Sequence, residues 1–244
     1  MDRWKGKVAL VTGASSGIGK ATALRLAEEG MMVVAAARRL DRLERLAGEH
    51  ANIHPMAVDL RDTDAIVALF QRIRREHGGV DVLVNNAGLG RRAPLMSGET
   101  EHWREMLEVN VLGLSVCTRE AVADMTRDDL GHVIHISSMA GHRTPAGSAM
   151  YSATKFAVRS LTEALRQELR EAKSRVRVTA ISPGFVETEF AEVYSGDPEA
   201  AAATYARFEV LQSDDIADMV VYALGTPQRM QLHDMLVRPT DQPS

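Results

Sequence analysis

Cysteine is almost absent from this chain of 244 residues, in which Cys117 is the only one. A lone thiol rules out an intrachain disulfide, which suits a reducing compartment, and Cys117 stands in an apolar helical stretch where we expect it only to pack. Aromatic residues are scarce, and the net charge of −4 gives no basis for nucleic-acid binding. No metal site is expected.

Long hydrophobic runs are also missing. The longest, Met31 to Ala37, is far shorter than the roughly 20 residues of a membrane-spanning helix. The charged start MDRWKGK is followed by an apolar run too short for the core of a secretory signal. We therefore expect a soluble, cytoplasmic protein with no membrane partner.

What the chain does contain is a regular alternation of short apolar runs and longer helical patterns. Apolar runs that are buried on both faces are typical of a parallel sheet. The expected strands are 7–12, 31–37, 53–58, 80–85, 132–137, 175–182 and 233–238, and the expected helices are 20–29, 41–49, 62–77, 101–127, 151–173 and 214–224. This order predicts a single-domain α/β fold over 1–244, a Rossmann-type doubly wound parallel sheet of about seven strands with helices on both faces.

One segment breaks the alternation. Residues 187–211 form an insertion between the sixth expected strand and the last expected helix, and a Ser-Gly-Asp-Pro turn lies inside it. This composition predicts two short helices joined by a hinge, as in a lid over a substrate site.

A glycine-rich turn, TGASSGIG, follows the first expected strand and opens the first expected helix. Glycines let the backbone turn tightly and approach a pyrophosphate, and the helix N-terminus offers free N–H groups. We expect this turn to bind a dinucleotide through Gly13, Ser15, Ser16, Gly17, Ile18 and Gly19.

The end of the second expected strand indicates which dinucleotide. A carboxylate there would bind the ribose 2′-hydroxyl of NAD, but the strand ends in alanines followed by Arg38 and Arg39. Two guanidiniums can bind a 2′-phosphate, which favours NADP(H); the alternative is that both are surface charge. After the next two strands, an adenine edge and an adenosine wall are expected at Asp59, Leu60, Asn86, Ala87 and Gly88.

Tyr151 and Lys155 carry the chemical signal. Their spacing places both side chains on one face of a helix. A nearby ammonium favours the phenolate and lowers the pKa of a tyrosine. The pair is therefore interpreted as an acid/base, with Ser138 thirteen residues upstream as a candidate partner.

Together, TGASSGIG, NNAG, Asn110, Ser138, YSATK and the PG of ISPGFVET resemble the short-chain dehydrogenase/reductase family, in order and in spacing, over essentially the whole chain. The C-terminal half resembles a mammalian-type branch of NADP-dependent reductases that act on keto steroids and other carbonyls. A second relative is the 3-hydroxy acid (serine-type) dehydrogenase group, which also carries the arginine pair.

The resemblance implies a role for each matching residue. Tyr151 is the general acid/base, Ser138 holds the substrate oxygen, and Lys155 binds the nicotinamide ribose and lowers the pKa of Tyr151. Asn110 positions a water that relays protons from Lys155. The nicotinamide is lined by Pro183, Gly184, Val186 and Thr188. His135 departs from the family, where Asn is usual, and we expect it to pack or hydrogen-bond.

Substrate choice is expected to lie in a largely apolar wall, which favours a bulky or hydrophobic carbonyl. Its members are Leu89, Arg91, Met139, His142, Arg143, Met150, Phe185, Phe190, Tyr194 and Tyr205. Arg91 and Arg143 leave a second interpretation open, a 3-hydroxy acid held by its carboxylate. A nucleotide-sensing regulator without turnover is the alternative outside enzymes. Apolar residues spread around helices 101–127 and 151–173 predict a homo-oligomer, a tetramer rather than a dimer.

Overall fold

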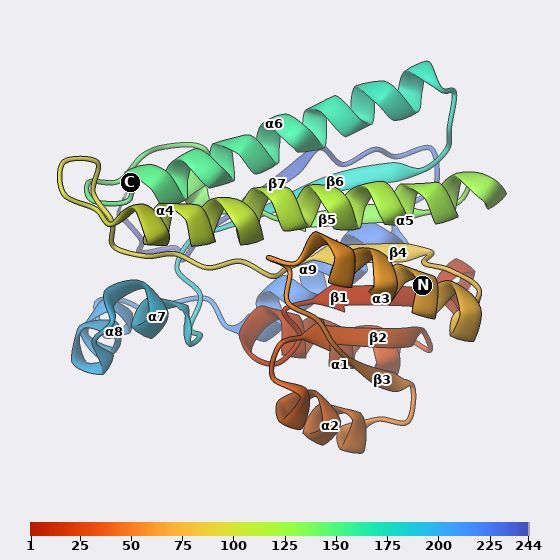
Figure 1. Ribbon diagram of the computed structural model, residues 1–244, viewed down its shortest axis with the longest axis horizontal. Helices are drawn as coiled ribbons and strands as arrows, with labels where there is room; N and C mark the ends of the chain where they lie inside the picture. Colours follow the sequence, from red (N-terminus) through yellow and green to blue (C-terminus); the bar gives the residue numbers. More distant parts are fainter. Residues whose placement is uncertain (244) are drawn as a thin grey trace.

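The computed structural model describes residues 1–243, and its centre is one parallel sheet with strand order β3-β2-β1-β4-β5-β6-β7 (Figure 1). The order reverses between β1 and β4, so the connections leave these neighbours in opposite directions and open a crevice at their carboxyl ends. The strands are β1 Val8–Thr12, β2 Met32–Ala37, β3 Ile53–Ala57, β4 Val82–Asn85, β5 His132–Ile136, β6 Arg177–Pro183 and β7 Asp234–Val237. The predicted fold class is confirmed, and Ser244 lies outside the described residues.

The central strands are buried along their whole length because helices cover both faces of the sheet. One apolar core lies between the sheet and α1 Gly17–Glu28, α2 Leu40–Glu49 and α9 Ser213–Gly225. The other lies beneath α3 Thr63–His77, α5 Leu114–Asp128 and α6 Ala149–Glu171, and Cys117 packs within it. Short 3-10 turns occupy Asp2–Trp4 and Met139–Gly141. Within residues 1–243, no helix has the length and hydrophobicity to cross a membrane.

The segment 101–127, expected to be one helix, is not a single α-helix. It consists of α4 Thr100–Leu107, a π-helical segment Glu108–Gly113, and α5. A Cβ on Gly113 would lie 2.6 Å from the Leu60 carbonyl oxygen, so the segment packs against the end of the β3 connection. The wider turn therefore fits this contact and carries Asn110 at its centre. Such segments are frequent at functional sites.

The insertion forms two short helices, α7 Phe190–Ser195 and α8 Pro198–Tyr205, beside one end of the sheet (Figure 1). Gly196 joins them with φ of 71°, a left-handed conformation that favours glycine. The two ends of the insertion meet at an isolated parallel bridge between Val186 and Leu211. The Glu187 amide donates to the Leu211 carbonyl there at 2.9 Å. The predicted pair of helices with a turn between them is confirmed.

Candidate active site

Ser138, Tyr151 and Lys155 meet where β5 ends and α6 begins. Ser138 starts the 3-10 turn after β5, and its Oγ accepts a hydrogen bond from the Ala140 amide at 3.1 Å. Tyr151 lies in the first turn of α6. Burial raises the pKa of Tyr151 to about 12, and the Ser138 hydroxyl opposes that rise. The phenol is thus held in its protonated form at neutral pH.

Lys155 lies one turn further along α6, with Nζ 5.9 Å from the centre of the Tyr151 ring. Nζ donates to the Ile136 carbonyl oxygen at 2.9 Å, at the end of β5. Burial lowers the pKa of Lys155 to about 8. The expected lowering of the Tyr151 pKa by Lys155 is not seen in this arrangement: desolvation raises this pKa, Tyr194 adds to the rise, and only the hydrogen bond with Ser138 lowers it.

Asn110 is buried and its amide group is fully engaged. Nδ2 donates to the Leu89 carbonyl at 2.8 Å and to Thr154 Oγ1 at 3.1 Å, while Oδ1 accepts from the Leu89 amide at 2.9 Å. The side chain thus ties the loop after β4 to the π-helical segment and to α6. A water relay at Asn110 stays a prediction.

The glycine turn adopts a conformation that requires glycine at two positions. Gly13 and Gly17 have φ of 68° and 53°, values open to glycine at little cost. A Cβ at Gly13 would lie 2.8 Å from Ala87 Cα, and one at Gly17 would lie 2.9 Å from Thr188 Cγ2. Ser16 starts α1 without bonding its first amides, and the first turn holds no acidic residue. Free N–H groups at a helix N-terminus favour an anion.

Arg39 lies across this turn. Its guanidinium donates to Ser15 Oγ at 3.0 and 3.2 Å and to Ser16 Oγ at 3.0 Å. Arg38 is exposed and contributes to the lowered pKa of Asp59, whose main partner is Arg61. The structure therefore brings Arg39 to the turn and leaves Arg38 at the rim above Asp59.

The NNAG segment ties strand ends together, as expected. Asn86 Nδ2 donates to the Thr12 carbonyl at 2.9 Å, and Thr12 Oγ1 accepts from the amides of Asn86 and Ala87, each at 3.1 Å. A Cβ on Gly88 would lie 3.5 Å from Lys155 Nζ. The end of β1, the end of β4 and the lysine thus form one continuous wall.

The residues after β6 close the other side. Gly184 lies against β7 and its exit, since a Cβ there would be 2.8 Å from Arg238 Cβ. Val186 forms the base of the insertion with Leu211. The Thr188 carbonyl accepts a hydrogen bond from the Tyr205 hydroxyl at 3.1 Å. Thr188 therefore connects the glycine turn to the insertion.

Two aromatic side chains of α7 lie over Tyr151. Ring centres are 5.3 Å apart for Tyr151 and Phe190, and 6.3 Å apart for Tyr151 and Tyr194. The Tyr194 hydroxyl donates to the Gly147 carbonyl at 3.3 Å. Leu89 and Met150 belong to the same apolar cluster as Tyr151. The insertion thus lies over the Tyr151 side chain in the form described here.

Other members of the expected substrate wall are engaged elsewhere. Arg91 Nε lies 3.2 Å from Glu105 Oε2, and its Nη1 donates to the Val193 carbonyl, so it is not free to hold a substrate carboxylate in this form. Phe185 packs on Phe208. The Tyr205 hydroxyl is hydrogen-bonded to the Thr188 carbonyl. Among residues 1–243, Arg143 keeps a buried Nε without a hydrogen-bond partner.

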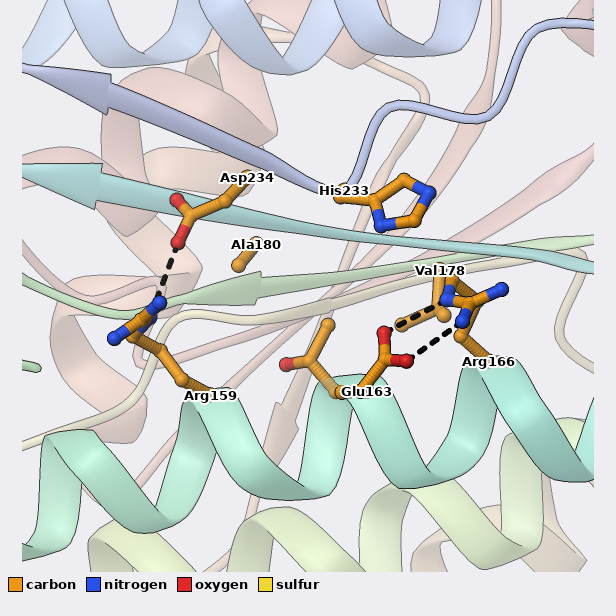
Figure 2. Close-up of a pocket in the computed structure, with 8 residues that line it drawn as sticks. Arg159, Glu163, Arg166, Val178, Ala180, His233 and Asp234 are labelled. Atoms are coloured by element: carbon orange, nitrogen blue, oxygen red, sulfur yellow. Dashed lines mark hydrogen bonds and ion pairs between the residues drawn. The ribbon is translucent and has the colours of Figure 1, made fainter.

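Asp234 contacts His142 and joins three parts of the site; Figure 2 shows its contact with Arg159. Oδ1 of Asp234 accepts from Ser182 Oγ at 2.7 Å, and Oδ2 lies 3.1 Å from His142 Nε2 and 3.3 Å from Arg159 Nε. This carboxylate links β7 to the end of β6, to the turn that follows Ser138, and to α6. A cavity of about 220 Å³ opens beside it, between α6 and strands β6 and β7, and no catalytic candidate lines it.

His135, the departure from the family pattern, is fully buried between two hydroxyls. Its Nδ1 lies 2.8 Å from Thr162 Oγ1 and its Nε2 lies 3.1 Å from Thr118 Oγ1. Burial lowers its pKa to about 3, so the ring is neutral. The predicted packing and hydrogen-bonding role is confirmed.

Sequence reasoning missed four residues at the site: Thr12, Arg42, Glu189 and Asp234. Thr12 is the last residue of β1 and Asp234 is the first residue of β7. A polar residue at the end of an apolar strand is a signal that the sequence offered. Arg42 and Glu189 are brought together from elements 147 residues apart, and no local pattern marks that pairing.

A seven-stranded Rossmann-type sheet with a glycine turn at its switch point and a Ser, Tyr and Lys cluster beside it defines a dinucleotide-dependent oxidoreductase. The family model described as "short chain dehydrogenase" matches residues 7–198. The chain belongs to the short-chain dehydrogenase/reductase family.

Several relatives match over nearly the whole chain. "Dehydrogenase/reductase SDR family member 11" of Bos taurus is 49% identical over 99% of each chain. "Farnesol dehydrogenase" of Aedes aegypti is 42% identical over 98% of each. Among solved structures, the closed form of a serine dehydrogenase complexed with NADP+ is 34% identical, with a TM-score of 0.93 over 97% of this chain and 96% of that one. The branch that the C-terminal half resembles is confirmed.

Proposed function

We propose that the chain is an NADP(H)-dependent oxidoreductase that interconverts a ketone and a secondary alcohol, on a bulky or hydrophobic substrate. The observation that carries this is the meeting of Ser138, Tyr151 and Lys155 beneath the aromatic rings of Phe190 and Tyr194. An acid/base group with a raised pKa lies there beneath apolar rings, and closure over a substrate would exclude water from it.

The chain's own residues bind the substrate oxygen and supply its proton. The bound nicotinamide supplies or accepts the hydride. Ser138 and Tyr151 hydrogen-bond the substrate oxygen, and Tyr151 donates its proton as negative charge builds there. Lys155 holds the nicotinamide ribose, and Asn110 places a water that relays protons from Lys155 to solvent.

NADP(H) fits the residues around the adenosine end. The glycine turn packs against Ala87 and Thr188 more closely than side chains would allow, and the free amides at the start of α1 suit the pyrophosphate. Gly13, Ser15, Ser16, Gly17, Ile18 and Gly19 would hold it. Arg38 and Arg39 would bind the 2′-phosphate, while Asp59, Leu60, Asn86, Ala87 and Gly88 would line adenosine. Solved relatives bound to NADP support this assignment.

The substrate class follows from the cover of the site. Phe190, Tyr194, Leu89 and Met150 surround Tyr151 with apolar surface, which suits a keto steroid, a dicarbonyl or a long-chain alcohol. The relative named farnesol dehydrogenase agrees with a bulky apolar substrate. Residues 187–211 would act as the lid over it.

A 3-hydroxy acid is the second candidate substrate. The serine dehydrogenase that is similar in structure favours it, as does the buried, unpartnered Nε of Arg143 within the described residues. A carboxylate would give that guanidinium a partner. Arg91, in contrast, already has one in Glu105.

The oligomer is proposed on exposed apolar side chains. Leu107, Leu112 and Phe156 are 45%, 48% and 42% exposed on α4, the π-helical segment and α6. Burying these faces against other copies would give a homotetramer. A cytoplasmic location stays a prediction from the lone cysteine.

The test of the proposed function is an absorbance assay at 340 nm with the purified chain. NADPH is supplied with keto steroids, dicarbonyls and other ketones, and NADP+ with farnesol-like alcohols and 3-hydroxy acids. We expect the highest kcat/KM among the hydrophobic substrates. Turnover of 3-hydroxy acids alone would select the second candidate, and turnover of none would contradict both.

A further inference from the structure

The first residue before α7, Glu189, bonds two arginines across the adenosine end of the crevice. Its Oε2 accepts from Arg39 Nη1 at 3.0 Å and its Oε1 accepts from Arg42 Nη1 at 2.5 Å. The two arginines come from the start of α2, and Glu189 comes from the insertion. One carboxylate therefore connects the insertion to the residues that follow β2.

The donors of Arg39 are already engaged in this arrangement. Nη1 bonds Glu189, Nε bonds Ser15, and Nη2 bonds both Ser15 and Ser16. A guanidinium has five N–H groups in a fixed plane. A phosphate that uses the same plane must displace the carboxylate or lie beside it.

The carboxylate is charged, half-exposed and held by two ion pairs. Its pKa is lowered by the hydrogen bonds from Arg42 and Arg39. It lines a cavity of about 380 Å³ together with Arg39, Arg42, Arg91, Glu192, Val193 and Gly196. A second anion arriving here therefore meets a fixed negative charge, and like charges at short range oppose each other.

We propose that Glu189 competes with the 2′-phosphate of NADP(H) for Arg39 and Arg42, and that it thereby sets the cofactor preference and couples the phosphate to the insertion. With NADH, which has no 2′-phosphate, the contact between Glu189 and the arginines persists. With NADPH, the 2′-phosphate replaces Glu189 as the partner of the two guanidiniums, and α7 loses its contact with Arg39 and Arg42. The inference rests on the proposed use of NADP(H).

Calorimetry with Glu189→Gln tests the competition directly, without turnover. The titrants are NADPH and NADH, and also 2′,5′-ADP and 5′-AMP, which lack the nicotinamide. We expect NADPH and 2′,5′-ADP to bind the Glu189→Gln variant roughly five- to twentyfold more tightly than they bind the parent chain. NADH and 5′-AMP should change less than about twofold, since they carry no competing group.

Glu192→Gln is the matched control. Glu192 lines the same cavity, and the substitution removes the same charge, but Glu192 has no ion pair with Arg39 or Arg42 in the described structure. We expect its effect on NADPH to stay below about twofold. Glu189→Asp keeps the charge and should restore most of the parent affinities. An equal gain in both Gln variants would reduce the effect to net charge and overturn the proposal.

Hydrogen exchange tests the coupling. In the parent chain, the amides of α7 should exchange faster with NADPH bound than with NADH bound, and this difference should vanish in Glu189→Gln. An unchanged or weaker affinity for NADPH in that variant contradicts the role of Glu189. A parent chain without preference for 2′,5′-ADP over 5′-AMP contradicts the proposed cofactor instead, so the two failures are distinct.

Discussion

At the scale of single residues, the same desolvation acts on two groups with opposite results. Burial raises the pKa of Tyr151 to about 12 and lowers that of Lys155 to about 8. Near pH 7 the phenol keeps its proton, as a donor to a carbonyl requires, and the ammonium keeps its charge. The sequence predicted the pair from its spacing, but the direction of the Tyr151 shift depends on Phe190 and Tyr194, which arrive from a distant segment.

Tyr151→Phe removes the proton donor and keeps the ring that packs against Phe190. We expect kcat to fall by roughly 10²–10⁴-fold, the usual contribution of general acid catalysis. NADPH affinity, measured by calorimetry, should change little. More than a tenth of the parent kcat in a pure preparation would show that another group supplies the proton.

Lys155→Met removes a buried charge, and its effect on stability depends on pH. A lysine whose pKa falls from 10.5 to about 8 on folding opposes folding while it is charged. As pH rises from about 8 to 10.5, the folded lysine becomes neutral before the unfolded one does. The parent chain should therefore gain up to about 3 kcal/mol relative to the variant over this window.

Urea unfolding of both chains at pH 7 and at pH 10.5 measures this difference. Tyr151 titrates in both chains, so its contribution cancels. A free-energy difference between parent and variant that is equal at the two pH values would mean that Lys155 is not desolvated.

At the scale of elements, the strands and most helices follow from pattern alone, because buried runs and helical periods are local signals. The helix expected over 101–127 illustrates the limit. Its π-helical segment is tied by Asn110 to Leu89 and packs through Gly113 against Leu60, contacts between parts far apart in sequence. The contacts of Asp234 with Ser182, His142 and Arg159 are of the same kind. No window of sequence contains both partners.

Gly90→Ala tests whether α7 acts as a lid. A Cβ at Gly90 would lie 2.7 Å from Phe190 Cζ and 2.8 Å from Tyr194 Cδ2, so both rings must shift from the positions they hold over Tyr151. We expect the KM for a ketone to rise several-fold and the amides of residues 187–211 to exchange faster. The Kd for NADPH should stay the same.

Gly48→Ala is the control for that variant, since a Cβ there meets nothing within 4 Å. It should leave both KM and exchange unchanged. If Gly90→Ala behaved like Gly48→Ala, closure of α7 over Tyr151 would have no part in substrate binding.

At the scale of the whole molecule, α4, the π-helical segment and α6 leave Leu107, Leu112 and Phe156 facing solvent, while the central strands β1, β4 and β5 are buried. The sequence indicated this from apolar residues spread around two helices. Which of them remain exposed depends on how α4, α5 and α6 are rotated on the sheet, and this the sequence did not specify.

Phe156→Glu places a charge on the exposed face of α6. If this face lies between copies, burying an unpaired carboxylate there is costly, and the assembly should separate into smaller units. Light scattering coupled to size exclusion measures the mass. Leu40→Glu on α2 is the control, since Leu40 is 41% exposed and lies in the opposite helical layer. A mass equal to that of the parent in both variants would place the subunit contacts elsewhere.

The bridge between Val186 and Leu211 brings the two ends of the insertion together. The chain leaves the sheet and returns to it at neighbouring positions, so residues 187–210 form an exchangeable segment. Changes in the length or composition of this segment need not be transmitted to β6 or α9. Substrate range can therefore diverge among relatives by exchange of one contiguous stretch, while the acid/base residues and the glycine turn keep their places.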